Sequence, residues 1–373
     1  MRNLISIEDV SPGGWDALYS LCCEMIDRPG DYIDACRGKV LATLFYEPST
    51  RTNFSFQSAM QRLGGSAFGF AEPNATSVSK GETLADTVRI AASYADAVVL
   101  RSPLEGAALA ASLYCEIPLI NAGDGGHHHP TQTLTDMTTI ARLRGGIGGM
   151  TIGICGDLRY GRTVHSLILA LSKFADITYY LISPRELRTP GYILSRLRAA
   201  GARFFEVSEL TRTLPELDVL YMTRIQRERF GDPAEYDRLR GTYVLDRPAL
   251  GAARGDMLVM HPLPRLDEIA PDVDGDPRAV YFEQVRYGMY IRMALLLTLT
   301  GLGRKPVPPP TAAGPDGGHV CPNPDCVTRA EPYIPRLRRE DARAPGRVYC
   351  EYCDSEITRT APHGCCHTGS TEL

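Results

Sequence analysis

The alternation of strand-like and helical segments through the first three hundred residues is the feature that most constrains the fold. Segments with the helical spacing of apolar residues, such as Phe56, Met60 and Leu63, separate apolar runs that are typical of buried strands. This rhythm predicts parallel sheets with both faces covered by helices. The apolar runs lie at 39–46, 95–102, 117–123, 150–155, 176–182, 218–223 and 256–262.

About 300 residues is long for one such sheet, so we expect two doubly wound α/β domains. The glycine-rich segment "RGGIGGM" fits a boundary near residues 130–148. The run "MALLLTLTGLG" from Met293 is too short to cross a bilayer and predicts a buried helix. The N-terminal residues lack the apolar core of a signal peptide, so we expect a cytoplasmic protein. A net charge of −4 indicates neither a nucleic-acid partner nor a membrane surface.

The character of the chain changes after residue 303. The segment "GRKPVPPPTAAGPDGG" is rich in proline and glycine, which predicts an extended linker. Cys321 and Cys326 then form a C-x4-C pair, Cys350 and Cys353 form C-x2-C, and 23 residues separate the two pairs. Four thiolates so spaced predict one structural Zn²⁺ per chain, with no open position for catalysis. A segment this small needs the stability that a metal supplies.

The chain has eleven cysteines, and in a cytoplasmic protein we expect them to be reduced. Outside the two pairs they are scattered or adjacent, so we interpret them as small core residues or tail thiols. These are Cys22, Cys23, Cys36, Cys115, Cys155, Cys365 and Cys366.

The segment "FYEPSTRTNFSF" at 45–56 predicts an anion site. The strand ends at Tyr46, Pro48 interrupts regular structure, and Ser49 is a good N-cap for a helix beginning at Thr50 or Arg51. Free backbone N–H groups, flanking hydroxyls and one arginine at a helix N-terminus are suited to phosphate.

Further arginines follow the other strands. Arg101, Arg162 and Arg224 each come at or just after a predicted strand, and ligands of parallel sheets bind at the carboxyl ends of strands. The segment "GDLRYGRTVHS" is not the glycine fingerprint of a dinucleotide site. Because few carboxylates share these positions, we expect anionic ligands, such as a phosphate together with a dicarboxylate.

Three consecutive histidines precede Pro130 in "GDGGHHHPTQTL". Neighbouring side chains of an extended chain point to opposite faces, which argues against one metal site built from all three. Pro130 marks the start of a helix, so His129 lies at a helix N-terminus. That position favours a neutral imidazole able to donate a hydrogen bond to a carbonyl oxygen. We interpret His127 and His128 as loop residues.

Six motifs now establish a resemblance. Residues 1–303 closely resemble the catalytic chain of the aspartate carbamoyltransferase family, and the tail from Cys321 resembles the zinc-binding half of that enzyme's regulatory chain, so the chain looks like a fusion of the two. The motifs, in chain order, are "FYEPSTRT", "SKGETLADT", "HPTQTLTD", "GDLRYGRTVHS", "YMTRIQRER" and "HPLPR".

The resemblance implies a division of the chain into domains. Residues 1–130 together with 284–303 are expected to bind carbamoyl phosphate, and residues 131–283 to bind aspartate. A linker at 304–319 is followed by the zinc-binding domain at 320–358 and a disordered tail at 359–373.

The resemblance also implies a role for each motif residue. The phosphate is expected to be held by Ser49, Thr50, Arg51 and Thr52. The carbamoyl carbonyl is expected to be polarised by Thr52, Arg101 and His129, and its NH₂ group contacted by Gln132. The two carboxylates of aspartate are expected to be bound by Arg162, Arg224 and Gln226. Backbone carbonyls for the substrates are expected from Pro262 and Leu263. Residues that reach into a neighbouring subunit's active site, and so imply a homotrimer, are Ser77 at the carbamoyl phosphate and Lys80 at both substrates.

The activity so implied is the committed step of pyrimidine biosynthesis, in which an amine attacks a polarised carbonyl without an organic cofactor or a covalent intermediate. One alternative is a transcarbamoylase for ornithine or another amine, which Arg162 and Arg224 disfavour because they repel a cationic side chain. Another is a non-catalytic structural or regulatory paralogue. The linker is too short for the regulatory chain's nucleotide-binding half, so we expect no CTP or ATP control and no separate regulatory chain. Whether two trimers associate into a dimer of trimers is left open by the sequence.

Overall fold

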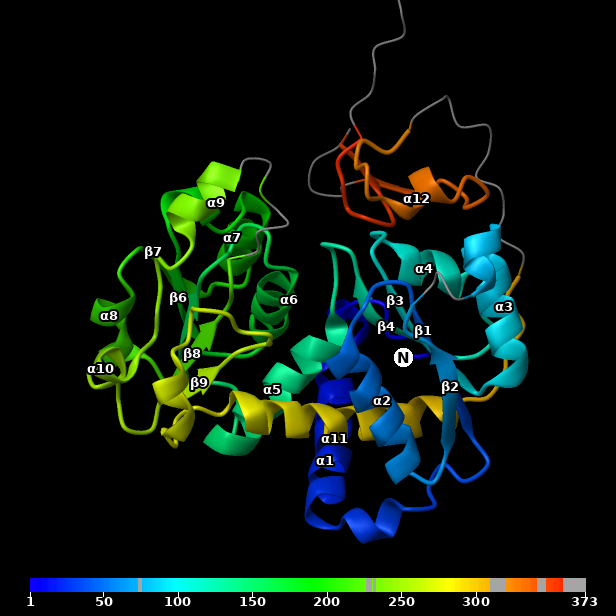
Figure 1. Cartoon of the computed structure of the whole chain (residues 1–373), viewed down its shortest axis with the longest axis horizontal. Coiled ribbons are helices and arrows are strands. Elements are labelled where there is room, and N and C mark those ends of the chain that lie inside the picture. Colours follow the sequence, from blue (N-terminus) through cyan, green and yellow to red (C-terminus); the bar gives the residue numbers. More distant parts are fainter. Residues whose placement is uncertain (73–75, 226–229, 231–232, 309–319, 341–346, 358–373) are drawn as a thin grey trace, which may run out of the picture.

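The computed structural model describes residues 1–72, 76–225, 230, 233–308, 320–340 and 347–357. Two lobes, each built on a parallel sheet with helices on both faces, lie side by side, and a small third unit lies over the N-terminal lobe (Figure 1). The predicted fold class, two doubly wound domains and a small cysteine-containing domain, is confirmed. No helix among the described residues is long and apolar enough to span a membrane.

The N-terminal lobe is a four-stranded sheet in the order β2-β1-β3-β4. All three strand pairs are parallel. The strands are β1 (Val40–Phe45), β2 (Ser66–Phe70), β3 (Ala97–Ser102) and β4 (Leu119–Asp124). The helices of this lobe are α1 (Pro12–Asp27), α2 (Thr50–Arg62), α3 (Leu84–Tyr94) and α4 (Ala107–Ser112).

The second lobe is a five-stranded parallel sheet in the order β7-β6-β5-β8-β9. Its strands are β5 (Thr151–Cys155), β6 (Thr178–Ile182), β7 (Arg203–Val207), β8 (Val219–Met222) and β9 (Leu258–Met260). Its helices are α6 (Arg162–Leu171), α7 (Gly191–Ala199), α8 (Leu210–Thr213), α9 (Pro233–Leu239) and α10 (Arg247–Leu250).

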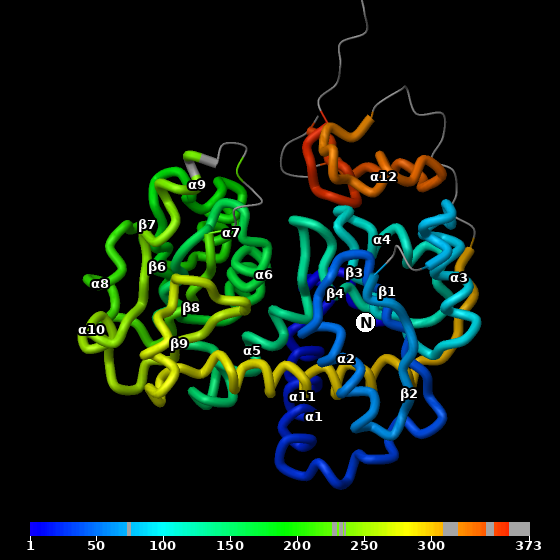
Figure 2. Tube along the Cα trace, in the orientation of Figure 1, coloured from blue at the N-terminus to red at the C-terminus, as the bar shows by residue number. Residues whose placement is uncertain are grey.

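Two buried helices, α5 (Pro130–Arg144) and α11 (Tyr281–Thr300), join the lobes. They pack against each other, and α11 continues along α1 and α2 beneath the N-terminal sheet (Figure 2). One apolar core therefore runs through both lobes, with Leu134 of α5, Ile152 of β5 and Leu295 of α11 all buried in it. The apolar run from Met293 lies in α11, as the sequence predicts.

The unit over the N-terminal lobe, residues 320–357, contains α12 (Val327–Ala330) and the antiparallel pair β10 (Arg338–Glu340) and β11 (Val348–Cys350). We call it the cysteine module. Glu105 anchors it, since its N–H donates to the Asp325 carbonyl (2.9 Å) and its carboxylate accepts from Asn323 Nδ2 (2.6 Å). Most of the predicted linker and the tail lie outside the described residues, so the predicted domain limits stay predictions.

Gly106 lets the module approach α4 closely. Its φ is +80°, a left-handed conformation that favours glycine, and a Cβ there would lie 2.4 Å from Cβ of Tyr352. Tyr352 is itself buried in the apolar cluster that α3, α4 and the module share. The module therefore packs on the N-terminal lobe as part of the fold.

Candidate active site

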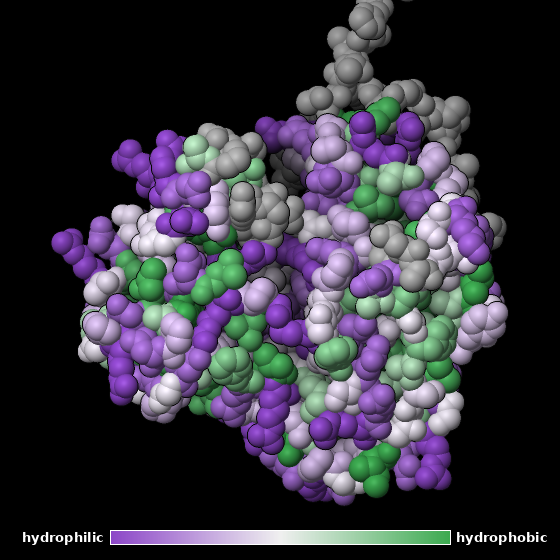
Figure 3. All heavy atoms as spheres, viewed as in Figure 1, coloured by the Kyte–Doolittle hydropathy of each residue, from purple (hydrophilic) through white to green (hydrophobic). Residues whose placement is uncertain are grey.

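A cavity of about 490 Å³ opens between the lobes, where the carboxyl ends of strands from both sheets face each other. Hydrophilic side chains gather in this region of the surface (Figure 3). The cavity brings together most of the residues that the sequence singles out. Those that line it are Ser49, Thr50, Arg51, Thr52, Arg101, His129, Gln132, Arg162, Arg224, Pro262 and Leu263.

Three predicted residues are not part of this cavity. Ser77 and Lys80 bound a 3-10 helix (Ser77–Lys80) on the N-terminal lobe, and both are exposed away from the cavity lining. This position is compatible with the prediction that they act in a neighbouring subunit, which stays a prediction. Gln226 lies outside the described residues.

The residues that the sequence predicts to bind phosphate lie at the start of α2. The helix begins at Thr50 with Ser49 as N-cap residue, as predicted, and the Ser49 hydroxyl makes no capping hydrogen bond within the described chain. The first N–H groups of the helix are therefore left for a ligand at the cavity wall. Burial lowers the pKa of Arg51, and the nearby charge of Arg224 lowers it further. The positive charges of Arg51 and Arg224, which belong to different lobes, therefore repel each other.

Arg101 lies at the end of β3, almost completely buried. Its guanidinium donates to the Ala122 carbonyl (3.2 Å) and forms an ion pair with Glu47 (3.1 Å). Burial lowers the pKa of Arg101 to about 10, and the charge of Arg162 adds to this, whereas Glu47 opposes it. The side chain is therefore fixed in place with a donor edge at the cavity.

His129 is the N-cap residue of α5 and is buried. Its Nε2 lies 3.4 Å from NH1 of Arg101, and a guanidinium only donates hydrogen bonds, so Nε2 accepts and the proton resides on Nδ1. Burial lowers the pKa of His129 well below its ordinary value, and the charges of Arg101 and Arg162 lower it further. The geometry fits the neutral imidazole that the sequence pattern predicts.

The turn after β9 forms the opposite wall. His261 Nδ1 accepts from the Leu263 N–H (2.7 Å), and His261 Nε2 donates to the carboxylate of Glu268 (2.7 Å). Burial raises the pKa of Glu268, but the hydrogen bond from His261 lowers it below its ordinary value overall. Leu263 has a φ of +55°, which non-glycine residues rarely adopt. This pair of hydrogen bonds holds the turn in that conformation.

Sequence reasoning missed some of the cavity's polar residues, above all Arg292. This arginine of α11 is buried and donates to Ser55 Oγ (3.1 Å) and the Gly288 carbonyl (3.0 Å), with its guanidinium over the Phe56 ring. Burial lowers its pKa to about 10. One arginine within the apolar segment "GMYIRMALLL" was the available signal. Other lining residues that were missed are Glu47, His261 and Gln284.

The charge of the cavity lining is strongly asymmetric. Among the described residues, five arginines contribute to the lining and a single acid, Glu47, opposes them. Arg51 and Arg101 belong to α2 and β3 of the N-terminal lobe, and Arg162 and Arg224 follow strands of the second lobe. Arg292 belongs to α11 and contacts Ser55 of α2. A lining with this excess of positive charge favours anionic ligands.

Comparisons with known proteins agree with this geometry. Residues 2–142 match the family described as aspartate/ornithine carbamoyltransferase, carbamoyl-P binding domain. Residues 148–299 match the Asp/Orn binding domain of the same family. The chain belongs to this carbamoyltransferase family. Residues 317–362 match the metal binding domain of the aspartate carbamoyltransferase regulatory chain.

Individual relatives indicate which enzyme within this family the chain is similar to. The aspartate carbamoyltransferase catalytic subunit of Clostridium novyi is 52% identical over 301 residues, covering 81% of this chain and 98% of that one. The catalytic subunit of M. jannaschii aspartate transcarbamoylase is 46% identical with a TM-score of 0.76, covering 81% and 98%. The Trypanosoma cruzi enzyme, solved in complex with carbamoyl phosphate, is 39% identical with a TM-score of 0.76, covering 80% and 95%.

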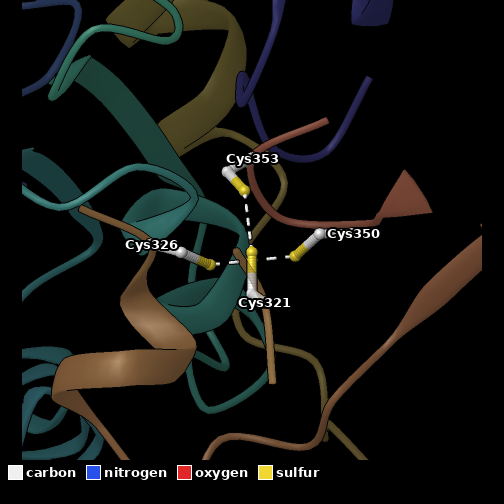
Figure 4. A group of neighbouring side chains, drawn as sticks. All are labelled: Cys321, Cys326, Cys350 and Cys353. Carbon is white, nitrogen blue, oxygen red and sulfur yellow. Dashed lines mark hydrogen bonds between the residues drawn. The ribbon is translucent and has the colours of Figure 1, made fainter. Parts of the chain in front are cut away.

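The cysteine module holds a candidate metal site. The sulfur atoms of Cys321, Cys326, Cys350 and Cys353 converge (Figure 4), all within 4.8 Å of one another and buried. Sγ–Sγ distances are 3.5 Å for Cys321–Cys353 and 3.7 Å for Cys326–Cys350. Four sulfurs around a tetrahedral ion at about 2.3 Å lie about 3.8 Å apart, so the four residues fit a structural metal ion.

The histidine run has a further contact that the sequence did not predict. His127 and His128 lie near Asp354 of the module. Both ring nitrogens of His127 are engaged by carboxylates, Nδ1 by Asp124 (3.3 Å) and Nε2 by Asp354 (3.0 Å). His127 is therefore a contact between the cysteine module and the N-terminal lobe as well as a loop residue.

Proposed function

We propose that the chain transfers the carbamoyl group of carbamoyl phosphate to the amino group of L-aspartate, giving N-carbamoyl-L-aspartate and phosphate in pyrimidine biosynthesis. The observation that carries this assignment is the single cavity in which five arginines of both lobes meet. Its charge suits a dianionic acyl phosphate beside a dicarboxylate. Relatives 52–53% identical over most of the chain are aspartate carbamoyltransferase catalytic subunits.

In the proposed complex, carbamoyl phosphate lies against the N-terminus of α2. Ser49, Thr50 and Arg51 bind the phosphate through backbone N–H groups and side chains. Thr52, Arg101 and the Nδ1–H of His129 donate to the carbamoyl oxygen. Positioning both reactants within one cavity supplies a large part of the rate enhancement.

The reaction then needs no protein nucleophile. The aspartate nitrogen attacks the carbamoyl carbon, the new C–N bond forms, and negative charge develops on the carbamoyl oxygen. The donors already directed at that oxygen stabilise the charge. The C–O bond to phosphate breaks, and the departing phosphate takes the proton from the nitrogen.

The second substrate is proposed to occupy the side of the cavity formed by the second lobe. Arg162 and Arg224 there favour a dicarboxylate, and the Pro262 and Leu263 carbonyls accept from its ammonium or amine. The discriminating experiment is carbamoyl transfer by the purified protein with aspartate and ornithine compared side by side. Transfer to aspartate alone is expected; transfer to ornithine alone would instead support the amine alternative, and no transfer to either the non-catalytic one.

We further propose that the metal of the cysteine module is zinc, one ion per chain, held by four thiolates in a closed tetrahedral site. Zinc there would stabilise the module and take no part in the reaction. The module already covers the Glu105–Gly106 surface of its own chain, which supports a fusion that works without a separate regulatory chain. Metal analysis of the purified protein would identify the ion.

The exposed 3-10 helix ending at Lys80 supports a homotrimer with shared sites. The test uses two inactive variants, Lys80→Ala and Arg51→Ala, purified separately and then mixed under conditions that exchange subunits. If Lys80 acts in a neighbouring site, mixed trimers contain some sites with both residues intact and activity reappears. Activity that stays absent in mixed trimers of confirmed composition would contradict shared sites.

A further inference from the structure

Asp136 is a completely buried carboxylate that lies behind the cavity wall, one turn after Gln132 on α5. Its Oδ1 accepts from Gln132 Nε2 (2.8 Å) and from Gln284 Nε2 (2.6 Å). Its Oδ2 accepts from the Tyr221 hydroxyl (2.9 Å). The donors come from α5, α11 and β8, so one carboxylate binds elements of both lobes.

Neutral donors surround this charge. No ion pair to Asp136 occurs among the described residues, and the nearest cationic influence is the charge of Arg292. Burial raises the pKa of Asp136 and the hydrogen bonds from Gln132, Tyr221 and Gln284 oppose this shift, so that the pKa is about 7 overall. A buried carboxylate held in this way costs more free energy than an apolar residue would, so a role in the site is a reason for its presence.

The carboxylate determines which end of the Gln132 amide faces the cavity. A side-chain amide has a donating NH₂ and an accepting oxygen, and Asp136 Oδ1 accepts from the NH₂ groups of both Gln132 and Gln284, which it can do whether the carboxyl is ionised or carries a proton on Oδ2. The Gln132 NH₂ is therefore bound to Asp136, and its oxygen accepts no hydrogen bond from the described residues. Because Gln132 lines the cavity, it offers an acceptor there. A carbamoyl NH₂ can donate to that oxygen, whereas the methyl of an acetyl group cannot.

Gln284 is oriented by the same carboxylate. Its NH₂ donates to Asp136, and its oxygen accepts from the backbone N–H of His261 (3.1 Å). His261 in turn accepts from the Leu263 N–H, so the turn that forms the far wall is connected to Asp136 through one side chain. Reversing the Gln284 amide would break both of its hydrogen bonds.

We propose that Asp136 is the positioning residue that fixes the Gln132 amide with its oxygen toward the substrate, and so selects a carbamoyl group over an acyl group without N–H. Through Gln284 the same carboxylate holds the 261–263 turn against α5. The inference rests on the proposed function, since it assigns the carbamoyl NH₂ to Gln132.

The test is Asp136→Asn, which keeps the shape but allows the neighbouring amide to reverse. Carbamoyl phosphate and acetyl phosphate are compared in the intact protein by their kcat/KM with aspartate, and by the inhibition constant of acetyl phosphate where its transfer is too slow. The preference for carbamoyl phosphate is expected to fall at least about fivefold, the factor that one neutral hydrogen bond supplies. Tyr221→Phe is the matched control, since it removes a donor to Asp136 without freeing Gln132, and its preference is expected to stay at the wild-type value.

An Asp136→Asn protein that folds and keeps the wild-type preference would overturn the proposal, as would an equal loss in Tyr221→Phe. If Asp136→Asn does not fold, Gln132→Met decides, because it lacks the accepting oxygen and must lose the same preference; a wild-type preference would overturn the proposal. Wild-type protein that fails to carbamoylate aspartate would instead contradict the proposed function.

Discussion

Nε2 of His127 lies 3.0 Å from Oδ2 of Asp354, so the loop that leads into α5 is bound to the residue that follows Cys353. Asp354 also accepts from Arg339 (2.6 Å), which holds the carboxylate within the module. His127 precedes His129 by two residues. The cysteine module is thus in contact with the segment that carries the neutral imidazole of the cavity.

This contact predicts a pH-dependent stability. Burial lowers the pKa of His127, but hydrogen bonds to Asp124 and Asp354 raise it to about 10 overall. A raised folded-state pKa means that stability is fully present below about pH 6.5 and is lost as the pH rises toward 10. His127→Gln is expected to lower the free energy of unfolding at pH 6.5 by about 2 kcal/mol, since Asp354 is half-exposed and solvent screens it. Denaturant unfolding at several pH values measures this.

The difference between wild type and His127→Gln should vanish near pH 10.5, where the wild-type imidazole is neutral. Asp354→Asn is the companion variant and should show part of the same loss. A difference between wild type and His127→Gln that does not change between pH 6.5 and 10.5 would rule out the ionic contribution.

We predict that removal of the metal opens the cysteine module locally. A chelator strong enough to strip the ion, or Cys350→Ser, should increase hydrogen exchange in residues 321–357 and in α4, which the module covers. Strands β5 to β9 share no core with the module and should keep their protection. Cys155→Ser is the control, since Cys155 is buried outside the cluster. Unchanged exchange in the module after the ion is lost would contradict a structural role.

Much of this architecture can be predicted from the sequence, and the elements that cannot be predicted were missed for physical reasons. The buried strands are continuous apolar runs, and Ser49 and Pro130 mark where α2 and α5 begin. The edge strands β2 and β7 were missed because half-exposed strands such as "SAFGF" and "RFFEV" lack such a run.

Contacts between residues far apart in the chain could not be predicted from the sequence either. Asp136 and Gln284 are 148 residues apart, and no local pattern predicts that their side chains meet. In the sequence Arg292 is one charged residue within an apolar helical segment, and only the packing of α11 places it at the cavity. Long-range polar networks of this kind become visible only in three dimensions.

We predict that the Arg51→Ala substitution causes a large loss of turnover. Among the described residues, Arg51 is the only cationic side chain in the first turn of α2, and it lines the cavity. No other residue of that turn can replace its charge. We expect kcat to fall by about 10² to 10³, as when a preorganised electrostatic contact to the reacting groups is lost. Arg62→Ala, at the far end of the same helix, should retain wild-type kinetics. Steady-state rates with aspartate and carbamoyl phosphate check both, and wild-type turnover of Arg51→Ala would exclude its role.

The protonation state of His129 gives another prediction. Because burial and three arginines lower its pKa well below 6.5, the imidazole should stay neutral at pH 6 in the unliganded protein, with the proton on Nδ1. Nitrogen-15 NMR of the histidine side chains distinguishes this tautomer from imidazolium. His127, whose pKa is raised, should be doubly protonated in the same spectrum and serves as the internal reference. An imidazolium signal for His129 at pH 6 would refute the neutral donor.

Gly123→Ala tests how closely the cavity's cations are packed. Gly123 has a φ of +124°, and a Cβ there would lie 3.0 Å from NH1 of Arg101 and 3.4 Å from the His129 ring. The variant should lose about 1 to 3 kcal/mol of stability to backbone strain, and the displaced Arg101 should raise the KM for carbamoyl phosphate. Gly145→Ala is the matched control, because its φ is +78° but no atom lies within 4 Å of the added carbon. It should be destabilised with an unchanged KM, so a KM that rises equally in both variants would trace the effect to general strain and exclude a specific displacement of Arg101.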